Sequence, residues 1–231
     1  VDNNSSNGTG LLLKEEYKNE NRINVIISDK NLGFANGNNL GFEYAKYKFK
    51  ADFIIMINND TYLIQNNFCE KIIEEYKNSK FAVLGPKIIL PNNKVNPVVK
   101  NLPTLNEFKK YLKRLKIDYI TTLFYVNSFY LNVRKIIKNI FIKMKWKQNI
   151  EVENVDYDKR YENIVLHGCA LIFSKEYINL FDGLDNRTFL YNEEDLLALR
   201  LKNHNLKNVY NPKIVIFHNE DSATNAITKT K

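Results

Sequence analysis

The feature that most constrains the fold is an alternation of strand-like and helix-like segments along the first part of the chain. The strand-like segments are 23–28, 53–57 and 81–90. The helical segments are 11–20 and 66–79, and the glycine-containing stretch 31–49 leads into another helix. Residues 66–79 carry apolar side chains at positions 68, 72, 73 and 76, which is a helical spacing. Such alternation is typical of α/β proteins, so the sequence predicts an open, mostly parallel central sheet flanked by helices.

The second half of the chain resumes this pattern after an interruption. Residues 163–174 are strand-like, 186–204 run into a helix, and 208–218 form a last strand that ends at His218. With 231 residues, 44% of them hydrophobic, the chain can bury a sizeable core, and we expect one domain over 1–218. That domain has two halves, 1–96 and 163–218, and a polar tail follows at 219–231. The opening residues, VDNNSSNGTG, are typical of a strand end entering a polar turn, so the first strand of the sheet is expected to be missing from this chain.

The interruption at 97–162 predicts a basic, amphipathic helical insert. Residues 107–147 hold eleven Lys and Arg against Glu107 and Asp118, a local net charge of +9, although the whole chain carries only +8. The uncharged run 119–133 is shorter than the roughly 20 apolar residues of a membrane-spanning helix. Two interpretations stay open: a helix lying on an anionic membrane, or a solvated insert covering the sheet. Nucleic-acid binding is disfavoured because no recognised motif accompanies the charge.

The two cysteines, Cys69 and Cys169, lie far apart and lack a CxxC spacing. This pattern suggests neither a disulfide framework nor a zinc site, and it favours a reducing compartment. We therefore expect a cytoplasmic protein, which the basic segment 107–147 would place at the inner face of the cell membrane.

Two apolar strands end in residues that could hold a cation. The stretch IIMINNDTYL (54–63) breaks into Asn58-Asn59-Asp60, and in open α/β sheets ligands bind beyond the carboxyl ends of the strands. A carboxylate there can hold Mg²⁺ or Mn²⁺. The alternative, favoured by this stretch alone, is a turn that caps the following helix. His218 is a possible second ligand if it shares the crevice, although a lone histidine there is more often structural.

Two other stretches also have a structural and a functional interpretation. In NLGFANGNN (31–39) glycines precede a helix, where backbone N–H groups can approach phosphate oxygens, but a plain glycine-rich connection is equally compatible. Three acids, Glu193, Glu194 and Asp195, open an apolar helix, where acidic residues ordinarily favour the helix dipole. One such carboxylate held near an acceptor hydroxyl would be a competent general base.

The order of these motifs resembles the family 2 glycosyltransferases of the GT-A fold. VDNNSSNGT, NLGFANGNNLG, INNDT, HGCALIFS and FLYNEEDLLALRL follow one another and precede a strand that ends in histidine. The resemblance covers roughly residues 1–90 and 163–218. It is strongest to the bacterial rhamnosyltransferase-like branch that builds O-antigens, capsules and related polysaccharides.

The resemblance implies roles for individual positions. Asn58-Asn59-Asp60 occupies the DxD position with Asn in place of the first Asp, so Asp60 would be the metal carboxylate and His218 would complete the metal site. Glu194, six residues before Arg200, would be the catalytic base, with Asp195 as the rival. The segment His167–Cys169 would lie where the acceptor-side strand enters the site. The implied nucleotide-sugar contacts are Asp2, which would recognise the base, and Asn31, Gly33, Gly37, Asn39, Asn58 and Asn59.

The activity that the resemblance implies is an inverting transfer of a hexosyl or rhamnosyl group, aided by a divalent cation, Mg²⁺ or Mn²⁺. The donor would be a nucleotide-diphosphate sugar, and the acceptor a glycan or a lipid-linked saccharide in cell-surface polysaccharide synthesis. A lipid-linked acceptor would give the basic segment 107–147 a reason to contact an anionic membrane. A chain without the first strand is also compatible with a non-catalytic or truncated glycosyltransferase-like subunit that serves binding or assembly.

Overall fold

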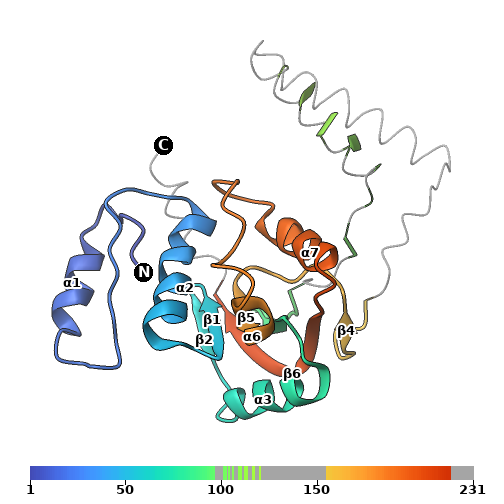
Figure 1. Cartoon of the computed structure of the whole chain (residues 1–231), viewed down its shortest axis with the longest axis horizontal. Coiled ribbons are helices and arrows are strands. Elements are labelled where there is room, and N and C mark those ends of the chain that lie inside the picture. Colours follow the sequence, from blue (N-terminus) through green and yellow to red (C-terminus); the bar gives the residue numbers. More distant parts are fainter. Residues whose placement is uncertain are drawn as a thin grey trace. The chain divides into compact units, whose positions relative to one another are not determined.

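The computed structural model describes residues 1–96 and 155–219, together with scattered positions between 101 and 120 (Figure 1). Contacts divide the chain into two compact units, Val1–Leu102 with Asp156–Lys231, and Pro103–Val155. Most of the basic segment and the polar tail lie outside the described residues. The boundaries of the insert at 97 and 162 stay predictions.

The first unit is built on a mixed sheet. Its strands run in the order β1-β5-β3-β6-β2, and β4 pairs with β6. The strands are β1 (Phe53–Ile57), β2 (Thr61–Leu63), β3 (Val83–Ile89), β4 (Tyr161–Glu162), β5 (Ala170–Ser174) and β6 (Asn208–His218). Of the ladders between these strands, β3–β6 is parallel, whereas β1–β5, β3–β5, β2–β6 and β4–β6 are antiparallel.

The prediction of a mostly parallel sheet is therefore wrong, and the position of β5 gives the reason. A helical crossover aligns the two strands that it joins, and β1 and β3, which flank α3 (Phe68–Ser79), do run in the same direction. They are not neighbours, however, because β5 inserts between them and runs the opposite way. The alternation predicted the direction of these strands correctly. It could not predict which strands are neighbours, because β5 comes after the insert in the sequence.

Several predicted segments are shorter than expected. The strand at 23–28 is reduced to an isolated parallel bridge between Asp2 and Ile27. Residues 163–169 precede β5 as a loop rather than as part of the strand, and Asn163 there adopts a left-handed φ of 57°. The segment 186–204 does run into a helix, as predicted, and that helix is α7 (Glu193–Asn203).

Helices pack on the sheet through regularly spaced apolar side chains. In α3, Phe68, Ile72 and Tyr76 recur at helical spacing and are buried. In α2 (Phe34–Phe49), Phe42 is 1% exposed and its ring lies edge-on to that of Phe173 in β5, with the centroids 5.3 Å apart. Each fully buried aromatic or aliphatic side chain contributes about 1.5–3 kcal/mol. The two other helices are α1 (Thr9–Glu16) and α6 (Lys175–Ile178).

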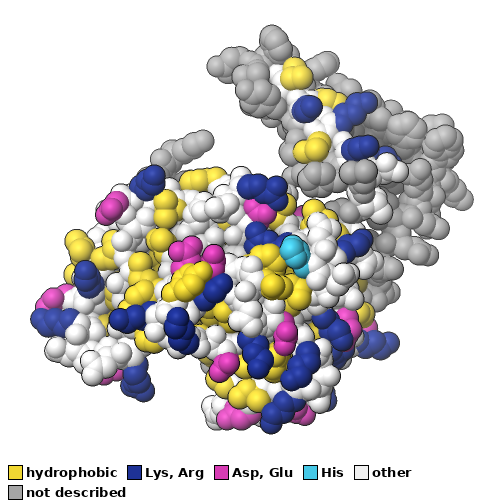
Figure 2. Space-filling model, viewed as in Figure 1, with side chains coloured by type: hydrophobic (Ala, Val, Ile, Leu, Met, Phe, Trp, Pro, Cys, Tyr) yellow, Lys and Arg dark blue, Asp and Glu magenta, His cyan; other side chains and the backbone are white. Residues whose placement is uncertain are grey.

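Every residue of β5 is buried, so the core of this unit is centred on that strand. On the face shown in Figure 2, Lys and Arg side chains of the larger body are interspersed with Asp and Glu, in keeping with a near-neutral charge outside the basic segment. Among the residues that the structure describes, no helix is long and apolar enough to cross a membrane.

Candidate active site

The loop His167–Cys169, just before β5, connects the two halves of the candidate site. The N–H of Gly168 donates a hydrogen bond of 2.6 Å to Oε1 of Glu194, and the N–H of Cys169 donates one of 3.1 Å to Nδ1 of His167. The carbonyl of Cys169 accepts the N–H of Asn58 at 2.9 Å. One short loop therefore holds both the predicted base and the turn that carries the predicted metal carboxylate.

Asp60 and His218 meet at the end of β6, as the resemblance implied. Nε2 of His218 lies 3.1 Å from Oδ1 of Asp60, and the two side chains are only 7% and 12% exposed. The pairing of β2 with β6 places Thr61 opposite His218, and the N–H of Asn219 donates to the carbonyl of Asp60 at 2.9 Å. The sheet register thus sets the distance between two residues that are far apart in the sequence.

This pair fits part of a divalent-cation site. Within 1–96, 155–219 and the scattered positions, no group of three or more His, Cys, Asp or Glu could hold a metal ion. The separation of 3.1 Å between the carboxylate oxygen and the imidazole nitrogen is, however, close to the ~3.0 Å between adjacent ligands of an octahedral ion at about 2.1 Å from each. The donor set, one carboxylate and one imidazole, suits a cation that takes its other ligands from phosphate oxygens and water.

The three acids at the start of α7 are not equivalent. Glu193 is buried, and its Oε1 has no hydrogen-bond partner among the described residues. Glu194 and Asp195 are half-buried, and the hydrogen bond from Gly168 fixes the orientation of the Glu194 carboxylate. A Cβ at Gly168 would lie 3.4 Å from that carboxylate oxygen, which is ordinary van der Waals contact. Glu194 is thus joined to the central loop by a hydrogen bond.

A side chain that the sequence analysis missed, Asn3, organises the glycine-rich stretch 31–39. The prediction that this whole stretch precedes a helix is wrong, because α2 begins at Phe34 and Gly37 and Asn39 lie inside it. Its amide nitrogen donates to Oδ1 of Asn31 at 3.2 Å and to the carbonyl of Gly33 at 2.9 Å, and its oxygen accepts the N–H of Leu32 at 2.9 Å. A Cβ at Gly37 would lie 2.7 Å from the Asn3 amide nitrogen. Asn3 thereby brings together three predicted donor contacts, Asn31, Gly33 and Gly37. No periodicity or motif pointed to it, because the signal was a single amide in a polar turn.

The start of α2 also contacts the loop that precedes α7. The N–H of Phe34 donates to the carbonyl of Phe189 at 2.9 Å. Gly33 has a φ of +81°, and a Cβ there would lie 2.2 Å from the same carbonyl oxygen, so only glycine permits this approach. A backbone hydrogen bond therefore links the predicted donor-binding segment to the loop that leads into the predicted base.

Two of the remaining predicted contacts, Asn39 and Asp2, have hydrogen-bond partners in the described part of the chain. Asn39 donates to the carbonyl of Leu184 at 3.0 Å and accepts its N–H at 2.7 Å, so its amide holds α2 to the loop after α6. The Asp2 carboxylate accepts the N–H of Ser5 at 3.0 Å, and this hydrogen bond lowers the pKa of Asp2. Asn59 is exposed in the turn after β1. Roles of these residues in nucleotide binding stay predictions.

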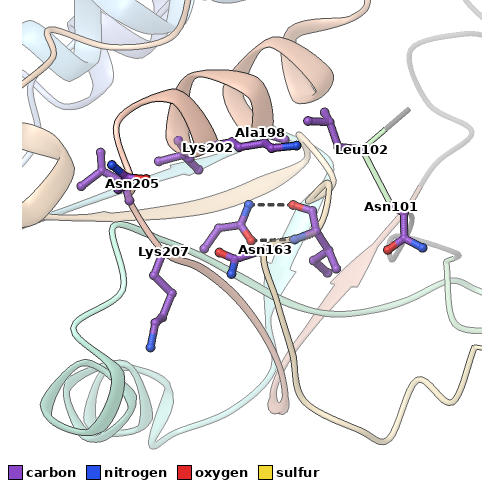
Figure 3. A pocket seen from close by; sticks show the side chains of 11 residues that line it. Asn101, Leu102, Asn163, Ala198, Lys202, Asn205 and Lys207 are labelled. Atoms are coloured by element: carbon purple, nitrogen blue, oxygen red, sulfur yellow. Dashed lines mark hydrogen bonds between the residues drawn. The ribbon is translucent and has the colours of Figure 1, made fainter. Parts of the chain in front are cut away.

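A separate pocket of about 600 Å³ lies away from these residues (Figure 3). It is formed by the C-terminal end of α7, the start of β6 and neighbouring loops, with Lys202, Asn205 and Lys207 among its lining residues. The amide of Asn208 in its wall is already paired with both backbone groups of Ile164. None of the predicted site residues lines this pocket, and it is not at the carboxyl end of β6. The candidate active site is therefore defined by the bonded side chains around His167–Cys169.

Comparison with known proteins supports the assignment of a family. A model of the family described as Glycosyl transferase family 2 matches residues 1–141. This range contains the glycine-rich stretch and Asp60, whereas His167–Cys169, Glu194 and His218 lie beyond it. No curated protein matches the chain.

Proposed function

The chain belongs to glycosyltransferase family 2, and from this we propose that it is an inverting glycosyltransferase that uses a nucleotide-diphosphate sugar. The observation that carries the proposal is the loop His167–Cys169, which binds Glu194 through one backbone group and the Asn58 turn through another. The loop thereby contacts both the proposed base, Glu194, and the turn that carries the proposed cation ligand Asp60.

Glu194 is proposed to take the proton from an acceptor hydroxyl. The acceptor oxygen then forms a bond to the anomeric carbon while the bond from that carbon to the diphosphate oxygen breaks, and the nucleoside diphosphate leaves with the electron pair. A single displacement from the opposite face inverts the anomeric carbon. The hydrogen bond from Gly168 holds one oxygen of Glu194 in place, which positions the carboxylate to accept the proton of the acceptor hydroxyl.

Asp60 and His218 are proposed to hold a divalent cation, Mg²⁺ or Mn²⁺. When bound, the cation would neutralise charge on the departing diphosphate. Asp2, Asn31, Gly33, Gly37, Asn39, Asn58 and Asn59 are proposed to form the donor-binding side. Support comes from the hydrogen bonds of Asn3, which gather Asn31 and Gly33 beside the start of α2.

The finer substrate assignment is also part of the proposal. The donor sugar is proposed to be a hexose or rhamnose, and the acceptor a glycan or a lipid-linked saccharide in cell-surface polysaccharide synthesis. The basic segment 107–147 is proposed to contact the anionic inner face of the cell membrane. Its described positions Lys109, Lys110, Lys113 and Lys116 are exposed.

The test is the substitution Glu194→Gln, assayed for release of nucleoside diphosphate from a panel of nucleotide sugars with Mn²⁺ or Mg²⁺. The amide keeps the shape of the side chain but cannot accept the proton, so turnover should fall about 10²–10⁴-fold while donor affinity changes little. Asp195→Asn should retain most of the activity. The exposed acid Glu70 provides the control, and Glu70→Gln should behave as wild type.

Two results would contradict these assignments. Full activity of Glu194→Gln would reject this residue as the base. A wild-type chain that binds nucleotide sugars but neither hydrolyses nor transfers them would instead indicate a non-catalytic binding subunit.

A further inference from the structure

The backbone fixes the imidazole of His167 in one tautomer. Its Nδ1 accepts the N–H of Cys169 at 3.1 Å, so Nδ1 carries no hydrogen. A neutral imidazole always has one N–H, which must therefore sit on Nε2. The side-chain nitrogen of Asn96 lies 3.5 Å from Nε2, but two donors cannot face each other. The Asn96 amide must therefore present its oxygen, an exchange of O and N that the hydrogen-bond network decides.

The position of this fixed donor is informative. The ring centroids of His167 and His218 are 6.0 Å apart, and His218 contacts Asp60. The next residue in the chain, Gly168, donates its N–H to the carboxylate of Glu194. Nε2 of His167 thus belongs to a half-buried ring between the proposed cation ligands and the proposed base.

The contact with Asn96 is weak enough to be exchanged for a stronger one. Its length of 3.5 Å exceeds the usual 2.7–3.2 Å of a hydrogen bond from nitrogen to oxygen, so it contributes little. A hydrogen bond from the same Nε2–H to an ionised phosphate oxygen would be shorter and roughly twice as strong as one between neutral groups. An anion bound beside Asp60 and His218 would offer such an acceptor.

We propose that His167 is a catalytic residue that donates from Nε2 to the diphosphate of the sugar donor. The bond would strengthen as negative charge develops on the leaving group, so it would favour the transition state over the bound donor. The loop would then have three functions in consecutive residues, since Gly168 orients the base and Cys169 sets the tautomer of His167. The inference rests on the proposed function, because it requires a nucleotide-diphosphate donor.

Two substitutions separate the two ring nitrogens. In His167→Asn the side-chain oxygen can replace Nδ1 as the acceptor for Cys169, but nothing replaces Nε2. In His167→Gln the amide nitrogen reaches the place of Nε2. The control is His204→Asn, the same change at the exposed C-terminal end of α7.

The measurements are the affinity for UDP and for dTDP with Mn²⁺, by calorimetry, the Tm without ligand, and the kcat for donor hydrolysis. His167→Asn should keep its Tm, bind the nucleoside diphosphate about tenfold or more weakly, and lose at least as much in kcat. His167→Gln should restore the affinity to within about threefold of wild type. His204→Asn should bind as wild type.

The outcomes distinguish the inference from the function on which it rests. A stably folded His167→Asn with wild-type affinity and kcat overturns the inference alone. If His167→Asn keeps wild-type affinity and kcat whereas His167→Gln does not, the inference is also overturned. The imidazole would then serve only to accept the N–H of Cys169 through Nδ1. If the wild-type chain binds neither these diphosphates nor any nucleotide sugar, the proposed function fails and the inference falls with it.

Discussion

Asp185 shows how single residues hold the loop before α7. Its carboxylate accepts two hydrogen bonds from the Arg187 guanidinium, at 2.8 and 2.7 Å, and lies 3.4 Å from that of Arg200 in α7. The hydrogen bonds from Arg187 are the main reason that the pKa of Asp185 is lowered to about 2. Because the folded-state pKa lies below the unfolded-state value, the ionised carboxylate stabilises the fold above about pH 4.

The substitution Asp185→Asn should therefore lower the Tm at pH 7, and the difference from wild type should shrink as the pH falls from about 4 to 2. The expected loss in the free energy of unfolding at pH 7 is about 1–2 kcal/mol. It is kept small because Arg187 is 74% exposed and solvent screens the pair. Thermal unfolding across this pH range measures it, with the exposed Asp29→Asn as control. A Tm difference that is independent of pH would show that the ionised carboxylate is not what stabilises the loop.

Residue types at the site were easier to predict than their contacts. Asp60 follows one apolar strand and His218 ends another, which made a shared crevice possible, but only the family resemblance implied that the two residues lie together. The hydrogen bond from Gly168 to Glu194 could not, because it depends on a loop conformation that carries no sequence pattern. Asn3 was missed for the same reason, since an amide in a polar turn is ordinary until its partners are known.

At the scale of elements, α2 is joined to the loop after α6 by a contact that leaves no room for a side chain. Gly183 has a φ of +139°, and a Cβ there would lie 2.2 Å from Oδ1 of Asn39. That oxygen accepts the N–H of Leu184, and the amide nitrogen of Asn39 donates to the carbonyl of the same residue. The paired hydrogen bonds between Asn39 and Leu184 thus require glycine next to them.

Gly183→Ala should destabilise the protein by more than the backbone strain alone, because the methyl group would also displace Asn39. We expect about 2–4 kcal/mol, from roughly 1–2 kcal/mol for each of the two effects. Gly8→Ala is the matched control, since Gly8 also has a positive φ, +72°, but a methyl group added there would meet no atom within 4 Å. Chemical denaturation compares the two. Equal losses for both variants would show that the contact with Asn39 contributes nothing.

The helices were predictable as elements, whereas their ends and the loops between them were less so. The spacing of Phe68, Ile72 and Tyr76 predicted α3 correctly, because an amphipathic stripe is a local property. The segment 163–169 was predicted as strand from its apolar character, yet it is a loop in which the Ile164 backbone pairs with the Asn208 side chain. Apolar character alone could not reveal this hydrogen bonding, because it depends on the side chain of Asn208, which is distant in the sequence.

At the scale of the whole molecule, the α/β class followed from the alternation of segments, but the sheet order did not. Local sequence specifies strands and crossovers, whereas the insertion of β5 between β1 and β3 joins parts of the chain that the insert separates. The family match covers residues 1–141, so the contacts between the first half and Glu194 or His218 come from the structure. The concentration of positive charge in 107–147, by contrast, could be counted from the sequence alone, because net charge does not depend on the fold.

The basic segment leads to a prediction about the whole chain. Its described positions include four exposed lysines, Lys109, Lys110, Lys113 and Lys116, and three exposed apolar side chains. These are Leu112, Ile117 and Ile120, which are 43%, 38% and 51% exposed. Lysines beside apolar side chains suit a surface that combines negative charge with an accessible hydrocarbon layer.

Changing these four lysines to Gln should weaken binding to vesicles that contain anionic lipid by about 100-fold or more, since each lysine near such a surface contributes about 1 kcal/mol. Co-sedimentation at low and high salt measures the effect, and salt should reduce wild-type binding. The control changes four exposed lysines of the other unit, Lys14, Lys18, Lys48 and Lys77, and should leave binding unchanged because the loss belongs to the segment rather than to net charge. Equal losses of vesicle binding in both variants would show that binding depends on overall net charge. Tighter binding to DNA than to vesicles would reject the membrane as the partner.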